Sequence, residues 1–156
     1  MFHRWAAPLL VLALCAMTPK YAAGQTQQKP REQGAGGLGR NFPNPFNPET
    51  FIRFAVDTVG GCIDGSRQHV VTLRVVNTLS RTVAHFVVRS DPNAPTSVSP
   101  LLAGQPIDNL KLGCGKYLGW WSGNLPNGRE APSGIYAAQL FIDGKPAGTQ
   151  KMLNSK

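Results

Sequence analysis

Two cysteines are the residues of this sequence with the clearest chemistry. The chain has 3 cysteines. Cys15 lies in an apolar N-terminal stretch, whereas Cys62 and Cys114 lie in the remainder of the chain. A pair of cysteines in an exported chain normally becomes oxidised to a disulfide. We therefore predict a Cys62–Cys114 disulfide, and two free buried thiols are the alternative.

The other reactive side chains form no recognisable catalytic or metal-binding pattern. His69 and His85 are isolated, and their spacing from the cysteines does not match that of zinc ligands. His85 lies in a β-rich run, where it is read as a strand residue and not as a general base. The sequence contains no nucleophile elbow, no phosphate-binding loop and no carboxylate pair. We predict no catalytic residue, no metal, no cofactor and no small-molecule substrate, and hence no enzyme.

Trp120 and Trp121 are the most prominent apolar residues. Successive residues of a strand point to opposite faces of a sheet, so one tryptophan must face the core and the other must face away from it. Trp121 shares a face with Tyr117 and is predicted to lie in the core. For Trp120 two interpretations stay open: an exposed binding anchor, or a ring packed under the long connection 91–106.

Short alternating runs separated by turn residues indicate how these side chains are positioned. The sequence has 17 glycines and 13 prolines, a content typical of many turns. The apolar runs that alternate or are rich in β-formers are 51–56, 70–76, 82–88, 117–121, 134–142 and 147–153. They predict an all-β fold, an Ig-like antiparallel β-sandwich of about six to seven strands. The predicted core includes Leu73, Val75, Trp121, Tyr136 and Leu140.

The N-terminal region is typical of an exported protein. Arg4 precedes an apolar stretch over 6–17 that is too short to span a bilayer, and small residues follow at Ala22 and Gly24. We predict a signal peptide over 1–24, export to the periplasm, cell surface or medium, and no transmembrane span after cleavage. An uncleaved anchor and a lipid on Cys15 are the alternatives. Residues 25–40, rich in glutamine and glycine, are predicted to be a flexible linker before the domain 41–156.

The charge distribution gives no sign of a nucleic-acid-binding surface. The formal net charge is +8, from 16 lysines and arginines against 8 acidic residues. The positive residues are scattered along the sequence and are not interleaved with aromatic residues, as a stacking platform for bases would require. We therefore predict protein partners and no nucleic acid.

Four segments together resemble a known family. They are NFPNPFNPETFIRFA at 41–55, VTLRVVNTLSRTVAHFV at 71–87, GWWSGNLPNGREAPSGIYAAQLFIDGK at 119–145, and KMLNSK at 151–156. This pattern resembles the FlgD-like Ig-like domain, described in exported bacterial proteins as the type A C-terminal sorting domain of the type IX secretion system. The residues that match the family motif are Pro43, Asn44, Pro45, Phe46, Asn47, Pro48, Trp121, Gly123, Gly128, Ser133, Gly134 and Tyr136. The chain departs from the motif at Val76, Ser80 and Ser122, where the family usually has Tyr, Gly and Asp.

The resemblance implies a function in export. In the family this domain is recognised by outer-membrane secretion machinery and normally follows a large cargo domain, whereas in this sequence the predicted linker 25–40 precedes it. Its signal lies at the C-terminal end, where Lys151, Met152 and Lys156 are the candidate residues. A structural or adhesive protein-interaction module is the alternative function.

Two structural expectations concern the ends of the domain. The proline-rich run 41–48 is predicted to be an extended entry strand at a sheet edge, because residues before proline favour extended geometry. The C-terminal run 149–156 is predicted to be an edge strand that a partner strand can pair with. Removing the polar residues 154–156 is then expected to leave folding almost unchanged.

Overall fold

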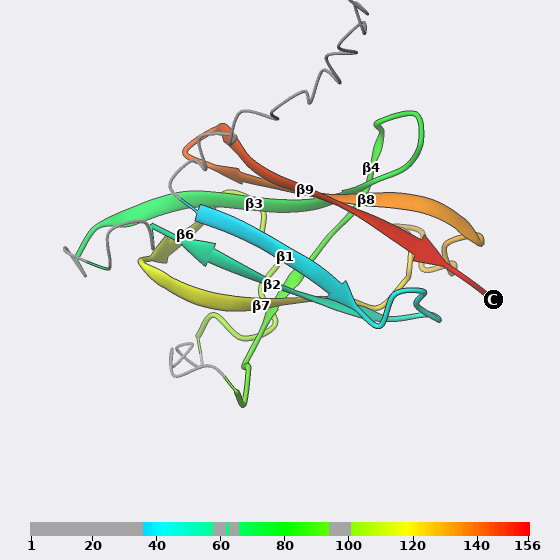
Figure 1. The fold of residues 1–156 in the computed structure, drawn as a ribbon, viewed down its shortest axis with the longest axis horizontal. Coiled ribbons are helices and arrows are strands. Elements are labelled where there is room, and N and C mark those ends of the chain that lie inside the picture. The colour runs from blue at the N-terminus through cyan, green and yellow to red at the C-terminus, as the bar shows by residue number, and fades with distance from the viewer. Residues whose placement is uncertain (1–35, 58–61, 63–65, 94–100) are drawn as a thin grey trace, which may run out of the picture.

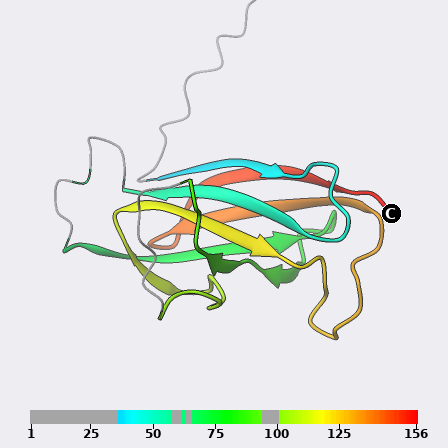
Figure 2. The same cartoon turned by 90° about the horizontal axis from the view of Figure 1, so that it is seen from below.

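The structure, a computed structural model, describes residues 36–57, 62, 66–93 and 101–156. The predicted signal peptide and residues 25–35 of the predicted linker lie outside this range. Two antiparallel sheets pack face to face in a β-sandwich, which confirms the predicted fold class (Figures 1 and 2). The described residues form no helix, and none of them belongs to a helix able to cross a membrane.

The first sheet has the strand order β1-β2-β7-β5, and the second has β4-β3-β8-β9 with β6 beside β3. The strands of the first sheet are β1 (Gly36–Phe42), β2 (Thr50–Val56), β7 (Gly115–Trp121) and β5 (Val87–Arg89). Those of the second are β4 (Thr82–His85), β3 (Gln68–Val76), β6 (Leu110–Gly113), β8 (Gly134–Ile142) and β9 (Lys145–Asn154).

The described chain has nine strands where the sequence predicted six to seven. Strand β1 begins at Gly36, so the sandwich starts five residues before the predicted boundary at Asn41. Strand β6 is short and was not predicted. The single run predicted over 82–88 is two strands, because β4 pairs with β3 in the second sheet and β5 pairs with β7 in the first.

Phe86 marks the point where the chain changes sheets. Its N–H donates to the carbonyl of Leu73 (3.0 Å), and its own carbonyl accepts from the N–H of Ile107 (2.7 Å). The N–H of Leu73 in turn donates to the carbonyl of Ile107 (2.9 Å). Both Phe86 and Ile107 are fully buried. A buried backbone must have its hydrogen bonds satisfied, and this three-way pairing does so at a corner between the sheets.

The alternation predicted for the strands places the core as expected. Leu73, Val75 and Leu140 have no exposed surface, and Trp121 and Tyr136 are also buried. The buried side chains of β3 and β8 form one core cluster with those of β2 and β7. The five predicted core residues are therefore confirmed.

The proline-rich segment 43–49 is a series of bends and not the predicted entry strand. The strand that enters the sheet is β1, which ends at Phe42. Near the end of this strand, the side-chain amide of Asn41 donates to the carbonyl of Pro43 and to Oγ1 of Thr50, each at 3.0 Å. The Thr50 hydroxyl donates to the same Pro43 carbonyl. These polar contacts, which join the two ends of the segment, hold the chain in a turn in place of an extended path.

Candidate functional site

The family-motif residues and the C-terminal strand meet at one end of the sandwich. The N–H of Phe46 donates to the carbonyl of Leu153 (2.9 Å), and the N–H of Ser155 donates to the carbonyl of Phe46 (3.0 Å). The two segments form a parallel bridge between Phe46 and Asn154. The proline-rich turn is thereby attached to the outer edge of β9.

Asn44 extends this pairing through its side chain. Its Oδ1 accepts from the N–H of Leu153 (3.0 Å), and its Nδ2 donates to the carbonyl of Lys151 at the longer distance of 3.5 Å. The outer edge of β9 between residues 151 and 155 is therefore already occupied by Asn44 and Phe46. The C-terminal run is an edge strand as predicted, since β9 ends the strand order of its sheet. Between residues 151 and 155, however, residues more than 100 positions earlier in the sequence already occupy the position of a partner strand.

A chain of aromatic rings connects this turn to the core. The ring of Phe46 lies 5.4 Å from that of Trp121, which lies 5.5 Å from that of Tyr136 in an edge-on arrangement. The Trp121 indole N–H donates to the carbonyl of Asn124 (2.9 Å), and the Tyr136 hydroxyl donates to the carbonyl of Pro132 (2.8 Å). Burial raises the pKa of Tyr136, so this hydroxyl stays protonated and able to donate.

The small motif residues shape the loop between β7 and β8. Gly123 has a φ of 78°, and a Cβ at this position would collide with the backbone carbonyl of Pro48. Gly128, with a φ of 77°, ends a turn in which its N–H donates to the carbonyl of Leu125 (2.9 Å). The hydroxyl of Ser133 accepts from the backbone N–H of Lys156 (3.2 Å). Both ends of the loop are thus fitted to the proline-rich turn and to the C-terminus.

Asn154 is a buried structural residue, contrary to the expectation for the last three residues. Its side-chain amide donates to the carbonyls of Ala131 (3.0 Å) and Pro132 (3.2 Å), and the residue is 2% exposed. Removing residues 154–156 would leave the buried carbonyl of Ala131 without this donor, whereas the carbonyl of Pro132 keeps its hydrogen bond from the Tyr136 hydroxyl. The expectation that removing these residues leaves folding almost unchanged stays a prediction, and the burial of Asn154 argues against it.

The three candidate sorting residues occupy different environments. Lys151 is exposed and Met152 is fully buried in the core. The Lys156 ammonium pairs with Glu130 at 2.8 Å, and both side chains remain largely exposed. Beside Lys151, the outer face of the second sheet presents Leu153, which is 41% exposed, and its cross-strand neighbour Ile135, which is 46% exposed. Lys151, Leu153 and Ile135 therefore form the accessible surface of this end, and we call them the C-terminal surface.

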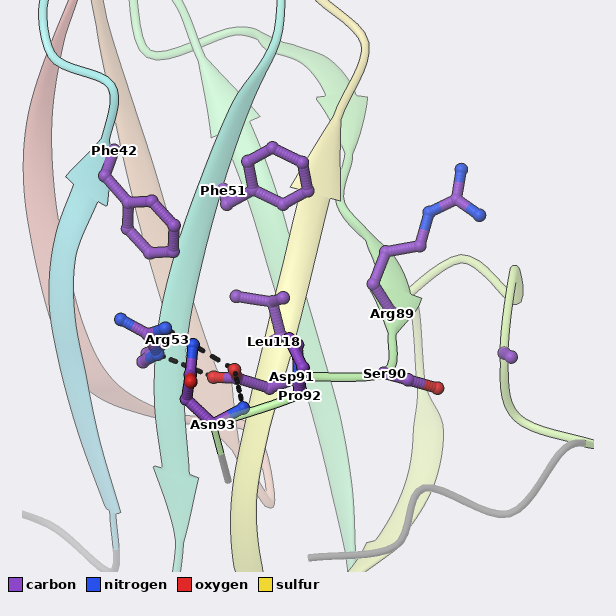
Figure 3. Close-up of a pocket in the computed structure, with 10 residues that line it drawn as sticks. Phe42, Phe51, Arg53, Arg89, Ser90, Asp91, Pro92, Asn93 and Leu118 are labelled. Atoms are coloured by element: carbon purple, nitrogen blue, oxygen red, sulfur yellow. Dashed lines mark hydrogen bonds and ion pairs between the residues drawn. The ribbon is translucent and has the colours of Figure 1, made fainter. Parts of the chain in front are cut away.

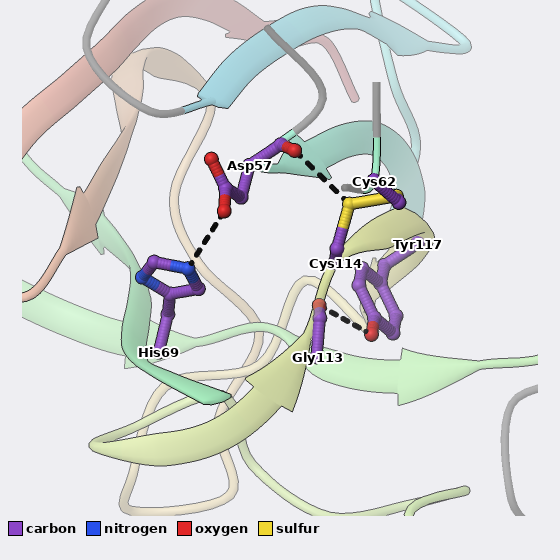
Figure 4. Close-up of a disulfide and its surroundings, with 6 residues drawn as sticks. All are labelled: Asp57, Cys62, His69, Gly113, Cys114 and Tyr117. Carbon is purple, nitrogen blue, oxygen red and sulfur yellow. Dashed lines mark hydrogen bonds and ion pairs between the residues drawn. A yellow bond between two sulfur atoms is a disulfide. The ribbon is translucent and has the colours of Figure 1, made fainter. Parts of the chain in front are cut away.

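The predicted Cys62–Cys114 disulfide is present at the other end of the sandwich, with the Cα atoms 5.6 Å apart (Figure 4). The Sγ atom of Cys114 lies 3.0 Å from the carbonyl oxygen of Asp57. Cys114 separates β6 from β7, and so the disulfide is attached where the chain passes from one sheet to the other.

A buried histidine lies close to this disulfide. The ring of His69 is 2% exposed, and its nitrogens face Asp143 (2.7 Å) and Asp57 (3.3 Å). The hydrogen bond from His69, with a second from the N–H of Val70, lowers the pKa of the Asp143 carboxyl. His85, by contrast, is at the surface of β4, 3.7 Å from Asp108. In the described part of the chain, no three His, Cys, Asp or Glu side chains are grouped so as to hold a metal ion.

Trp120 faces away from the core, on the outer surface of the first sheet. It is half-buried, its indole N–H donates to Glu49 (2.8 Å), and the guanidinium of Arg89 lies 4.2 Å from its ring centre. The sequence did not reveal these contacts, because both partners lie on other segments of the chain.

Comparisons with known proteins add little to this description of the site. No family model matches the chain, and no curated protein matches it significantly. Among solved structures, it is similar to the Pseudomonas fluorescens alkylpurine DNA glycosylase AlkC bound to DNA containing an abasic site analog. The identity is 10% and the TM-score is 0.45, and the match covers 78% of this chain and 31% of that chain. The chain thus spans about a third of that protein, and a similarity this low carries no inference about function.

Proposed function

We propose that the chain is an exported, non-catalytic β-sandwich module that resembles the type A sorting domain and is recognised through its C-terminal end by outer-membrane secretion machinery. One observation carries this proposal: the residues of the family motif, which are dispersed over the sequence, surround the C-terminal strand. Phe46, Trp121 and Tyr136 form its aromatic support. Asn44 occupies its outer edge.

This arrangement favours recognition of a surface over pairing with a partner strand. The backbone N–H and carbonyl of Leu153 at the outer edge of β9 are already hydrogen-bonded, so a partner that binds there has to contact side chains. The C-terminal surface offers an exposed cation, Lys151, next to the exposed apolar pair Ile135 and Leu153. Apolar side chains next to a charge are the composition of many protein-interaction sites.

A reporter fusion tests the proposal. A reporter placed between the signal peptide and residues 25–156, in a host with type IX secretion machinery, is expected to reach the cell surface. Lys151→Glu combined with Leu153→Ser is expected to leave the reporter in the periplasm. Both side chains are exposed, so folding is preserved. The matched control is Leu79→Ser, at a leucine that is 72% exposed in the turn after β3.

The two functions give different outcomes in this experiment. A wild-type fusion that stays in the periplasm contradicts the sorting function and favours the alternative, a structural or adhesive module acting there. Equal surface display of the wild-type and the double-variant fusions contradicts the assignment of the C-terminal surface. Loss of display in the Leu79→Ser fusion has the same consequence, because it would show that any exposed leucine matters.

A further inference from the structure

The outer face of the first sheet carries a row of aromatic side chains. The strand register places Phe42 opposite Phe51, and Phe51 opposite Trp120. All three point away from the core, and the rings of Phe42 and Phe51 are stacked with their centres 5.8 Å apart (Figure 3). We call these residues the aromatic row. With strands about 4.8 Å apart, the row is about 10 Å long.

A second row lies two residues further along the strands from the aromatic row. It consists of a leucine with one arginine on each side. Arg53 and Arg89 both pair with Leu118 on the central strand β7. Phe42 and Phe51 of the aromatic row, but not Trp120, line an open hollow of about 490 Å³ together with the second row (Figure 3). The turn Ser90–Asn93 bounds it on one side. A hollow of this size and an apolar floor with a few polar groups are typical of small-ligand sites.

Arg53 is fixed in position and electrically compensated. Its Nε lies 2.6 Å from Oδ2 of Asp91, and its Nη2 lies 3.4 Å from Oδ1. This hydrogen bonding lowers the pKa of Asp91, which also accepts from the N–H of Asn93 (3.0 Å). The Arg53 side chain is nevertheless 51% exposed. Because a guanidinium has five N–H donors, Arg53 retains three for a ligand.

Arg89 is the uncompensated cation of the hollow. Among the described residues, no carboxylate lies within ion-pair distance of it. Its guanidinium is stacked on the ring of Trp120. Stacking uses the face of the guanidinium and leaves the N–H groups at its edge able to bind a carboxylate with two parallel hydrogen bonds.

We propose that this hollow binds an acidic glycan, a short strand of sugar rings that carry carboxylates. The C–H face of one sugar ring packs on Phe51, because the Arg53 guanidinium already lies over the ring of Phe42, 4.7 Å from its centre. Its hydroxyls accept hydrogen bonds from Arg53, whose charge Asp91 already neutralises. The carboxylate of a neighbouring sugar pairs with Arg89. The spacing of the two arginines across β7, about 10 Å at two strand separations, requires a ligand of more than one ring.

The geometry favours a glycan over the two other polymers that aromatic residues bind. Single-stranded nucleic acid carries a phosphate at every nucleotide and needs several cations along its path. The described lining of the hollow has one uncompensated cation, Arg89. An extended peptide that contacts Arg89 would pair with the sheet edge formed by β5, but this edge is already bonded at Val88 by Gly104 and Gln105.

The test measures binding of the purified full chain to defined oligosaccharides by calorimetry. The probes are trimers of galacturonate, glucuronate, guluronate and mannuronate, and the methyl ester of each trimer. We expect at least one uronate trimer to bind, with an affinity that falls as salt rises. Its methyl ester, which lacks the carboxylate charge, is expected to bind about tenfold more weakly.

Two variants and a matched control locate the site. Arg89→Gln is expected to weaken uronate binding about tenfold, and Phe51→Leu to weaken it for the ester as well. The control is Arg74→Gln on the outer face of the second sheet, where Arg74 lies 4.7 Å from the ring centre of Phe141. It removes the same kind of arginine–aromatic pair and is expected to leave binding unchanged. Thermal unfolding establishes that every variant is folded.

Three results would overturn the proposal. They are the failure of all four uronate trimers to bind the folded protein, equal affinities of Arg89→Gln and the wild type, and displacement of the bound trimer by an oligothymidylate or an acidic proline-rich peptide that binds more tightly. None of these bears on the secretion assay, because the hollow and the C-terminal surface lie on different sheets.

Discussion

At the scale of single residues, two buried asparagines hold the ends of the domain together. Asn41 fixes the start of the proline-rich turn, and Asn154 fixes the loop before β8. In both residues the amide N–H groups are bonded, whereas the buried Oδ1 has no protein partner. Their amide groups donate to loop carbonyls at the two ends of the domain.

Asn154→Ala is expected to destabilise the fold by about 1–3 kcal/mol, because it leaves the buried carbonyl of Ala131 without its donor. Ser155→Ala, next to it and exposed, is expected to change stability by less than about 0.5 kcal/mol. Urea unfolding of both variants measures the difference. Equal unfolding midpoints would show that the asparagine contacts do not contribute.

The carboxyl of Asp143 makes the stability of the fold depend on pH. Its pKa is lowered in the folded state by His69, so its contribution is fully present above the pKa of the unfolded chain, about 3.9, and is lost as the pH falls through the lower folded value. Asp143→Asn is therefore expected to be less stable than the wild type at pH 6, with the difference shrinking towards pH 2. Asparagine tolerates the φ of 51° at this turn. Urea midpoints that differ equally at both pH values would contradict this.

At the scale of elements, β3 determines how the second sheet is assembled. It pairs with β8 along six residues, with β6 over its first half and with β4 over its end. The buried positions alternate strictly from His69 to Val75, as the period-two pattern predicts. A strand with partners on both edges and one fully buried face cannot slip by one residue without exposing its core side.

Leu73→Ala is expected to cost about 2–5 kcal/mol, because it opens a cavity between the sheets at a side chain with no exposed surface. Arg74→Ala, on the opposite face of the same strand, loses a hydrogen bond to Gln139 and a contact with the ring of Phe141, and is expected to cost about 1 kcal/mol or less. Thermal and urea unfolding compare the two variants. Similar losses would mean that the register of β3 is wrong.

At the scale of the whole molecule, two ties connect segments that are far apart in sequence. The disulfide joins residues 52 positions apart at one end of the sandwich. At the other end, the proline-rich turn is bonded to the C-terminal strand, 109 positions away for Asn44 and Leu153. Each tie connects an earlier segment to a later one, so that the two sheets are held at both ends.

Reduction of the Cys62–Cys114 disulfide is expected to lower stability by about 4 kcal/mol, the chain-entropy estimate for a closed loop of this length. Thiol titration of the native protein is expected to find no free sulfhydryl at these two positions. The Cys62→Ser, Cys114→Ser double variant, measured beside the reduced wild type, separates the loss of the bond from the effect of the reductant. Titratable thiols at both positions in the native protein would contradict the pairing.

The local pattern of the sequence was sufficient for the sandwich and its core. Alternation with a period of two and frequent turn residues identified the main strands and the buried face of each, since these depend on neighbours along the chain. It did not identify β6, which is too short to alternate, or the sheet change at Phe86, which depends on Leu73 and Ile107. The disulfide followed from the two cysteines that remained after Cys15 was assigned to the signal peptide.

What only the tertiary structure decided is which surfaces stay accessible. The run 147–153 indicated a strand, and β9 is present there, but it did not indicate that Asn44 and Phe46 cover part of its edge, because that contact joins the first and last parts of the domain. Arginines that are scattered in the sequence, Arg53 and Arg89, lie beside the aromatic row only because the strand register brings β2, β7 and β5 together. Periodicity depends on adjacent residues and is readable from the sequence, whereas an edge or a hollow depends on pairing between distant strands, which only the folded chain determines.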